Sequence, residues 1–482
     1  PPTVSSVAIT NVVGAQNSFV NAGDNVSVTV TFSESPISAV IVDNPSAATL
    51  TLKVGNEDNR TAIYNRGSSI VVSSGSDNAS LVFSYIIQAT NTSGENDSDG
   101  ISIVANALNS DIITIRDAAG NIATDLTHDA VPDNSSVKVD TIPPAVDNFT
   151  MSDTELKIGD NATVTLEFSE PVCVSTSECT RSQTNAADPY FSNADITILN
   201  GSLSTMTSDD NETWIGTFTP AINTEDDSNT LSLATTYTDL AGNNGPDNQT
   251  ENYEVDTLAP TVIVAFSSEL TEGRQTLSGY GFLNEGDNVS VTATFSERVI
   301  VDNSSGPNPT ITLVVGSDNR TATYTSHDNA TLVFEYTIQA DETDSHGISI
   351  LGDTLALNGS TIKDAALNDA ILTHSAESDN SSYIVDTTAP TVSSVAITNV
   401  VGAQNSFVNA GDNVSVTVTF SESPISAVIV DNTSAATLTL KVGNDNRTAT
   451  YDSGDSTIVS SGSDNASLVF SYIIQATNTS GE

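Results

Sequence analysis

The sequence is poor in positive charge and has no long apolar run. Only 13 of its 482 residues are Lys or Arg, against 61 Asp and Glu, and the net charge is −48. Without a basic patch to neutralise phosphates, nucleic acid is excluded as a natural partner and anionic membrane surfaces are disfavoured. No stretch of 18 apolar residues is present, which excludes membrane insertion through a helix. No secretory leader is recognisable, so we expect a mature or internal piece.

Side chains that commonly carry catalysis are also scarce. The four histidines lie in expected loops and show no counterparts at matched positions elsewhere in the chain: His128, His327, His346 and His374. A catalytic centre brings a nucleophile, a base and an orienting group into one cleft, and serine and threonine are too frequent for any one to stand out. A single tryptophan, Trp214, is too little for an aromatic sugar-binding platform. We therefore predict a protein that is not an enzyme.

What the sequence has in abundance is internal repetition, the first pattern to settle in any chain. The ten residues that begin at Pro2 return at Pro390, and the copy continues to the last residue. Three markers define shorter units: Gly-Asp-Asn at 23, 159, 286 and 411, Phe-Ser-Glu at 32, 168, 295 and 420, and Val-Asp-Thr-x-x-Pro at 139, 255 and 385. They predict four repeats, at residues 1–141, 142–257, 258–387 and 388–482, of which the last is incomplete.

Each repeat has the pattern of a series of short β-strands. Apolar and hydroxyl side chains alternate strictly over residues 26–32, which is the period of a strand with one buried and one solvated face. Further strands are expected at residues 50–54, 81–85, 101–104, 112–115 and 137–139. Clusters of Asn, Asp, Gly and Ser separate them. Seven or eight strands in about 120–135 residues predict an all-β fold of antiparallel β-sandwiches.

The order of the motifs resembles the bacterial immunoglobulin-like repeats of giant surface adhesins and extracellular fibre proteins. After Phe-Ser-Glu come an acidic loop that ends in glycine, then Asp-x-Ala-Gly-Asn, then Val-Asp-Thr-x-x-Pro. The Asp-x-Ala-Gly-Asn element occupies residues 117–121 and 239–243, and residues 364–368 in altered form, with Leu367 at the glycine position. The resemblance implies tandem immunoglobulin-like sandwiches in an elongated rod, an extracellular or cell-surface location, and calcium at domain junctions.

Acidic loops at matched positions also predict calcium from the residues themselves, because Ca²⁺ prefers six to eight oxygen ligands. The loops lie at residues 95–100, 225–227 and 341–347, and more carboxylates join each one if the loops converge at one end of a sandwich. The predicted ligands are Glu34, Glu95, Asp97, Asp99, Asp117 and Asp140 in the first repeat, Glu170, Asp226, Asp239 and Asp256 in the second, and Glu297, Asp341, Asp344, Asp364 and Asp386 in the third. The alternative is that these acidic loops are simply solvated.

Asparagine sequons form the sharpest local pattern. The chain has 22 Asn-x-Ser/Thr triplets in which x is not Pro, and in 17 of them the Asn follows an Asp. Asp-Asn is a favourable turn dipeptide, so turn chemistry is the alternative to glycosylation. Because the sites recur in the divergent second repeat, we predict N-linked glycans. The predicted sites are Asn25, Asn59, Asn78, Asn134, Asn148, Asn161, Asn211, Asn248, Asn288, Asn303, Asn319, Asn329, Asn380, Asn413, Asn432, Asn446 and Asn465.

The two cysteines, Cys173 and Cys179, lie in an insertion that only the second repeat has. A closed loop of this size is common outside the cytosol, so we predict a disulfide, with two free thiols as the alternative. Its contribution to stability would be local, because short loops gain less from closure than long ones.

Two classes of function remain. The first is structural, a glycosylated and calcium-stiffened stalk segment whose partners are continuing copies of the repeat or neighbouring fibre subunits. The second is an adhesive module that recognises a glycan or a cell-surface partner. Near-identical return of the first repeat favours the structural class, because spacers are built by duplication. Glu482 aligns with Glu95, so we expect the missing strands of the fourth repeat to come from a continuing chain or from a neighbouring subunit.

Overall fold

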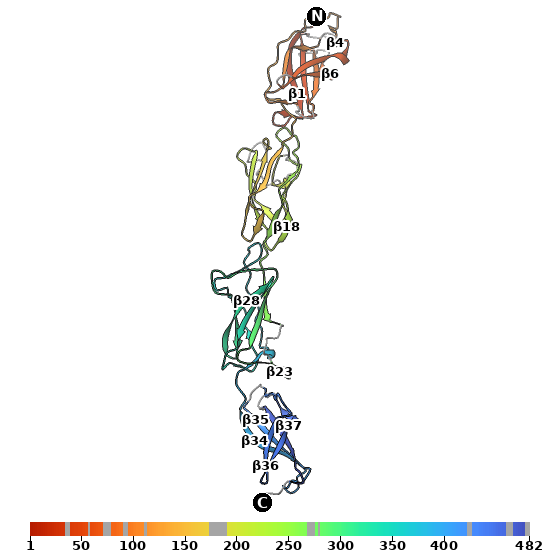
Figure 1. Cartoon of the computed structure of the whole chain (residues 1–482). Helices are drawn as coiled ribbons and strands as arrows, with labels where there is room; N and C mark the ends of the chain where they lie inside the picture. The colour runs from red at the N-terminus through yellow and green to blue at the C-terminus, as the bar shows by residue number, and fades with distance from the viewer. Residues whose placement is uncertain are drawn as a thin grey trace. The chain divides into compact units, whose positions relative to one another are not determined.

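The computed structural model describes residues 1–33, 39–55, 58–70, 79–89, 95–109, 113–172, 190–267, 275–277, 280–421, 427–458 and 466–477. Strands make up 53% of the structure, and the described residues hold no α-helix, only three short 3₁₀ helices. This confirms the predicted all-β class. The chain divides into two compact units, Pro1–Leu258 and Ala259–Glu482, and Figure 1 labels some of the strands of each unit.

The first repeat is built on a six-stranded sheet with the order β1-β3-β7-β6-β5-β9. A three-stranded sheet, β2-β11-β8, and a two-stranded sheet, β10-β4, complete it. The elements are β1 (Val4–Val13), β2 (Phe19–Val20), β3 (Asn25–Phe32), β4 (Val40–Val42), η1 (Pro45–Ala47), β5 (Thr49–Val54), β6 (Asp58–Ile70), β7 (Ser80–Ile86), β8 (Asn96–Asp97), β9 (Ser102–Leu108), β10 (Ile115–Asp117) and β11 (Lys138–Asp140).

The second repeat has a four-stranded sheet, β12-β14-β17-β16, and two three-stranded sheets, β13-β21-β18 and β15-β19-β20. Its elements are β12 (Val146–Met151), β13 (Glu155–Lys157), β14 (Ala162–Phe168), η2 (Asn193–Asp195), β15 (Ile196–Thr197), β16 (Gly201–Leu203), β17 (Thr213–Pro220), β18 (Glu225–Asn229), β19 (Ser232–Leu233), β20 (Asn248–Gln249) and β21 (Tyr253–Asp256).

The third repeat returns to a six-stranded sheet, β22-β25-β29-β28-β27-β31, with the smaller sheets β23-β24-β33-β30 and β26-β32. Its elements are β22 (Val262–Phe266), β23 (Gln275–Leu277), β24 (Tyr280–Leu283), β25 (Asn288–Phe295), β26 (Ile300–Asp302), β27 (Thr310–Val315), β28 (Asp318–Asp328), β29 (Thr331–Thr337), β30 (Thr343–Asp344), β31 (Ser349–Ile350), β32 (Thr361–Lys363), η3 (Ser381–Tyr383) and β33 (Ile384–Asp386).

In the fourth repeat the described residues form one five-stranded sheet, β34-β35-β38-β37-β36. Its strands are β34 (Val392–Val401), β35 (Asn413–Phe420), β36 (Thr437–Val442), β37 (Asp445–Thr457) and β38 (Ser467–Ile473). The register of β34 on β35 repeats that of β1 on β3, including both irregularities, as expected for a near-copy of the first repeat.

Strict alternation of side chains gives each repeat its own hydrophobic core. In β14 the side chains of Ala162, Val164, Leu166 and Phe168 are buried, and the residues between them face solvent or are half-buried. Separate apolar clusters fall within residues 20–139, 149–255, 262–385 and 418–474. Burying one such side chain contributes about 1.5–3 kcal/mol, so the sequence period itself selects the sandwich.

A parallel strand pair recurs near the end of the first three repeats. It joins β2 to β11, β13 to β21 and β24 to β33. In each pair the later strand carries the Val-Asp-Thr motif, whose valine is buried in the core of its own repeat. The register of this parallel pair therefore places the aspartate of the motif at the end of its sandwich.

Candidate metal centre

Three carboxylates from different elements meet where the first repeat ends and the second begins. Asp140 is the last residue of β11, Glu170 follows β14 after one residue, and Asp239 begins the loop 239–243. One carboxylate oxygen of each lies within 4.8 Å of the other two. All three belong to the unit Pro1–Leu258. We call this set the junction cluster.

The Asp-x-Ala-Gly-Asn loop holds the carboxylate of Asp239, which is 0% exposed. The backbone nitrogens of Ala241 and Asn243 donate to Oδ1 of Asp239, both at 2.9 Å, and Nδ2 of Asn243 donates to Oδ2 at 2.8 Å. The same Nδ2 reaches the backbone oxygen of Asp140 at 3.1 Å. Gly242 has φ +90°, a left-handed conformation that glycine adopts without strain. The loop thus fixes Asp239 beside Asp140.

The same loop geometry occurs in the first and third repeats. Asn121 donates to both carboxylate oxygens of Asp117, and Asn368 does so to Asp364. Leu367 keeps the turn with φ +74°, although a branched side chain is strained there. The motif therefore positions one carboxylate, even where Leu367 replaces its glycine.

Burial and mutual repulsion make the junction cluster unfavourable without a counter-charge. Burial first, then repulsion from Asp140 and Asp239, raises the pKa of Glu170 to about 7. Burial is also the main cause that raises the pKa of Asp140 and of Asp239. In the first repeat the side chain of Asn121 instead holds the pKa of Asp117 below its usual range. Three carboxylate oxygens with raised proton affinity form a donor set that suits a hard divalent cation.

Without a divalent cation, the second repeat should lose stability as the pH rises toward 7. The pKa of Glu170 lies above its unfolded value, so the folded repeat binds more protons than the unfolded one between pH 4.5 and about 7. Stability gained from that proton is lost as the pH rises through the folded pKa. Fluorescence of Trp214, the single tryptophan and a core residue of this repeat, reports its unfolding in chelator. Glu170→Gln should flatten the dependence, and equal slopes for the two proteins would contradict it.

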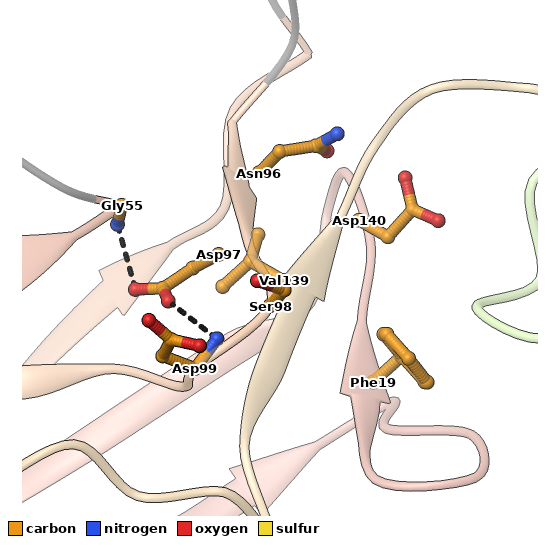
Figure 2. A pocket seen from close by; sticks show the side chains of 8 residues that line it. All are labelled: Phe19, Gly55, Asn96, Asp97, Ser98, Asp99, Val139 and Asp140. Carbon is orange, nitrogen blue, oxygen red and sulfur yellow. Dashed lines mark hydrogen bonds between the residues drawn. The ribbon is translucent and has the colours of Figure 1, made fainter.

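Asp97, a predicted ligand, is engaged by backbone donors. Gly55 N donates to Oδ2 at 2.6 Å, and Gly100 N donates to Oδ1 at 2.9 Å. Asp97 pairs with Val139 across β8 and β11, so its side chain faces the opposite side of the sheet from that of Asp140. Figure 2 shows the two carboxylates pointing away from each other in the hollow of about 290 Å³ that both residues line. Asp344 repeats the arrangement with Gly316 N at 2.8 Å and Gly347 N at 3.0 Å.

Glu95, another predicted ligand, is the buried acceptor of a polar network. Arg60 Nε forms an ion pair with its carboxylate, Tyr85 OH donates to it at 2.5 Å, and Gln88 N donates at 2.9 Å. The third repeat has the same network around Glu342, with Arg320, Tyr336 and Gln339. Sequence reasoning missed Glu342 because it stands between two acidic residues that looked equally suited to a loop site.

The other predicted ligands lie in several environments. Asp99 and Asp341 are exposed, and Asp226 is half-buried and accepts from Asn200 Nδ2 at 2.8 Å. Asp256 and Asp386 close the Val-Asp-Thr turn of their own repeats through the nitrogen two residues on. Glu297 and Asp364, both in the second unit, have carboxylate oxygens within 4.8 Å of each other. Glu34 lies outside the described residues.

The grouping of carboxylates differs from the expected one by a single repeat. The sequence suggested that Asp140 would join the acidic loop of its own repeat, with Glu34 and Asp117, if the loops converged at one end of the sandwich. Instead Asp140 meets Glu170 and Asp239 of the following repeat. The physical reason is the position of Asp140, which is the last residue of β11. It therefore lies at the end of the first sandwich, where the chain passes into the second repeat.

The sequon asparagines are accessible where the structure describes them. Asn78 and Asn465 lie outside the described residues, and none of the other 15 that follow an Asp is buried. Asn161 directly precedes β14, and Asn288 is the first residue of the matched strand β25. Their Oδ1 atoms accept from the hydroxyl of Thr219 at 2.7 Å and of Thr337 at 2.6 Å. Accessibility is necessary for a glycan, and glycosylation stays a prediction.

Two further expectations concern a disulfide and a membrane-spanning helix. Cys173 and Cys179 lie outside them, so the disulfide stays a prediction. Over the ranges that the structure covers, no helix has the length and apolar character to cross a membrane.

Comparison with known proteins gives one family match. Residues 140–255 match the family described as bacterial Ig-like domain, and no curated protein matches the chain. Among solved structures, titin domains A168–A170 align at 6% identity over 80% of this chain and 99% of theirs, with a TM-score of 0.20. The eight N-terminal Ig domains of Down Syndrome Cell Adhesion Molecule align at 8% over 96% of this chain and 56% of theirs (TM-score 0.15). The S-layer protein rSbsC(31–844) aligns at 11% over 96% and 67% (TM-score 0.15).

Proposed function

We propose that the chain is a structural segment of an extracellular fibre or adhesin stalk. The premise is that residues 140–255 belong to the bacterial Ig-like domain family and that the chain is a tandem of immunoglobulin-like β-sandwiches. The segment is non-catalytic, carries N-linked glycans and is stiffened by calcium. Its partners are further copies of the same repeat or neighbouring fibre subunits.

The junction cluster is the observation that carries this proposal. Asp140 belongs to a strand of one repeat, and Glu170 and Asp239 to the next, so a bound Ca²⁺ would tie two sandwiches together at their linker. Ca²⁺ accepts carboxylate and carbonyl oxygens in flexible geometry, which suits ligands from three separate segments. A spacer gains from such ties, because domain linkers are otherwise the flexible points of a chain. The experiment that tests the proposal is mechanical: calcium should lengthen the time that the second repeat resists a constant pulling force.

A coat of glycans on the Asp-Asn sequons is the second part of the proposal. The intact mass of material from the native source should exceed the polypeptide mass of 50.0 kDa by many sugar units. Peptides that contain Asn161 and Asn288 should be modified, because these accessible residues lie at matched positions in divergent repeats, Asn161 directly before β14 and Asn288 as the first residue of β25. If both peptides carry no sugar, the Asp-Asn pairs serve as turn residues only.

A further inference from the structure

A turn of the first repeat, at residues 14–21, reaches the second repeat. The side-chain nitrogen Nδ2 of Asn17 donates to Tyr190 OH at 2.6 Å and to the backbone oxygen of Leu240 at 2.9 Å. Both repeats belong to the same compact unit. We call residues 14–21 the hook of the first repeat, and Tyr190 together with the loop 239–243 the hook acceptor of the second.

A missing side chain makes room for the hook in the acceptor loop. A Cβ atom on Gly242 would lie 2.3 Å from Nε2 of Gln16, whereas a Cβ atom on the matched Gly120 of the first repeat would have no neighbour within 4 Å. Ala241 is 1% exposed and the matched Ala119 is exposed, as expected where a second sandwich covers the loop. The same loop sequence is therefore open in one repeat and occupied by the hook in the other.

The fourth repeat carries an identical hook. Residues 14–21 and 402–409 both read Gly-Ala-Gln-Asn-Ser-Phe-Val-Asn. Asn17 and Asn405 both have φ +51°, and the serines that follow them have φ +70° and +68°. Two successive left-handed residues are the geometry of a tight hairpin turn, and backbone hydrogen bonds of 2.6–2.9 Å between the glutamine and the phenylalanine close both turns. The hook thus has the same shape in both repeats.

The hook of the fourth repeat presents its side chains to solvent. Gln404 and Asn409 are exposed, whereas the corresponding Gln16 and Asn21 of the first repeat are half-buried. Because the turn already has the shape that docks in the first repeat, binding would require no rearrangement of its backbone. Such preorganisation lowers the entropy that association costs.

The third repeat shows which sandwiches the hook cannot fit. Its loop carries Leu367 in place of the glycine, with 53% of the side chain exposed and φ +74°. A leucine at the position of Gly242 would fill the space that Gln16 occupies. The second repeat, which precedes the third, has Ser-Asp-Thr at residues 152–154 between β12 and β13 instead of a hook. Within this chain the hook is therefore followed by the glycine loop, and the repeat without a hook by the leucine loop. A steric block of this kind gives specificity.

We infer that the hook of the fourth repeat, residues 402–409, is a docking surface for a further sandwich of the second repeat's kind. That partner has a glycine matched to Gly242 and a hydroxyl placed like that of Tyr190. The inference rests on the proposed function only in taking further repeats as partners. It requires no metal, because the two bonds of Asn17 join neutral groups. A contact this small should have a dissociation constant on the order of 1 mM between separate chains, which matches the effective concentration that a short linker supplies in series.

Photocrosslinking between full chains in chelator tests this inference. One chain has a diazirine amino acid in place of Gln404. The other chain is isotopically labelled and carries Gln16→Ala and Asn17→Gly, which remove the contacts of its own hook and free its acceptor. With each chain at about 1 mM, crosslinks from position 404 should join Tyr190 or residues 239–243 of the labelled chain. The diazirine amino acid at position 16 of an otherwise unchanged chain is the positive control and should give the same crosslinks within one chain.

Matched variants show whether the crosslinks report docking. Gly242→Leu in the labelled chain should lower their yield about tenfold, because the leucine overfills the contact. Leu367 shows that the loop accepts leucine, and Gly120→Leu is the control, with φ +87° against +90° and open space around it. Asn405→Gly in the reactive chain keeps the left-handed turn, loses the donor and should lower the yield about fivefold.

Three results would overturn the inference. They are no crosslink from position 404 under conditions where position 16 reacts, equal yields with Gly242→Leu and Gly120→Leu, and crosslinks that do not favour Tyr190 and residues 239–243. Since chelator is present throughout, none of these results bears on calcium at the junction cluster. Conversely, a chain that takes up no calcium can still give the expected crosslinks.

Discussion

Replacing Glu342 with glutamine should destabilise the third repeat by about 2–3 kcal/mol. The Glu342 side chain is 4% exposed and accepts hydrogen bonds from Arg320, Tyr336 OH and Gln339 N. Burial opposes its charge, but the bonds from Tyr336 and Arg320 outweigh burial and hold its pKa below the usual range. Burial and the bond to Glu342 raise the pKa of Tyr336 to about 12, so Tyr336 remains a donor.

The stability of the third repeat falls because the neutral amide of glutamine cannot accept all the hydrogen bonds that the Glu342 carboxylate accepts. An amide offers one oxygen where three donors converge, and its NH₂ would face Arg320 or Gln339. Arg320 is 31% exposed and can turn partly to water, which keeps the cost below that of a fully buried pair. Protection of the slowest-exchanging amides in β29 reports the stability of this repeat. Asp341→Asn removes a charge from the adjacent exposed position and should change protection by less than about 0.5 kcal/mol. Similar effects of the two changes would refute the role of the network.

Calcium should slow the mechanical unfolding of the second repeat by up to about 100-fold. A ligand present at 100 times its dissociation constant stabilises the folded state by about 2.7 kcal/mol. If the carboxylates that bind calcium separate before the transition state of unfolding, all of that free energy appears in the unfolding rate. Asp140 is the last residue of β11, where the chain leaves the first repeat, and Glu170 lies two residues after β14 of the second repeat, so pulling separates them early. Dwell times of single chains at constant force measure the effect.

The control is a carboxylate of the same repeat outside the junction cluster. Glu254 is exposed on β21, so Glu254→Gln should leave the calcium effect intact. Glu170→Gln should remove most of it and should lengthen dwell times in chelator, because one repelling charge is gone. Equal dwell times with and without calcium in the wild type would exclude a stiffening role for the junction cluster.

The sequence predicts strands well where side chains alternate without interruption. Residues 26–32, 50–54 and 81–85 fall in β3, β5 and β7. It misses β1, because two irregularities at Val4/Ser6 and Ile9/Asn11 shift the period. It also misses β6, whose polar, glycine-containing sequence forms a strand because β5 and β7 pair with it on both sides. Tertiary pairing therefore overrides local pattern in these two strands.

The residues of the candidate site could be predicted, but not their roles. Composition and spacing pick out Asp97 and Asp140 equally, as acidic residues near a strand. Only the register, with Asp97 opposite Val139 and Asp140 opposite Asn96, separates a carboxylate satisfied by backbone donors from one that meets two more carboxylates. The expectation that the histidines have no matched counterparts was wrong for a related reason. The backbone nitrogens of His128 and His374 donate to Asn106 Oδ1 and Asp353 Oδ1 in the same way, and a left-handed Asn106 or Asp353 leaves no local pattern in the sequence.

Calorimetric titration of calcium into the chelator-treated chain at pH 7.5 tests the central claim most directly. The wild type and Glu254→Gln should take up Ca²⁺ at a site that Glu170→Gln lacks. Binding should weaken at pH 5.5, where Glu170, with its pKa raised to about 7, holds a proton that calcium must displace. Calcium uptake by Glu170→Gln equal to that of the wild type, or no uptake by the wild type, would contradict a calcium-stiffened junction.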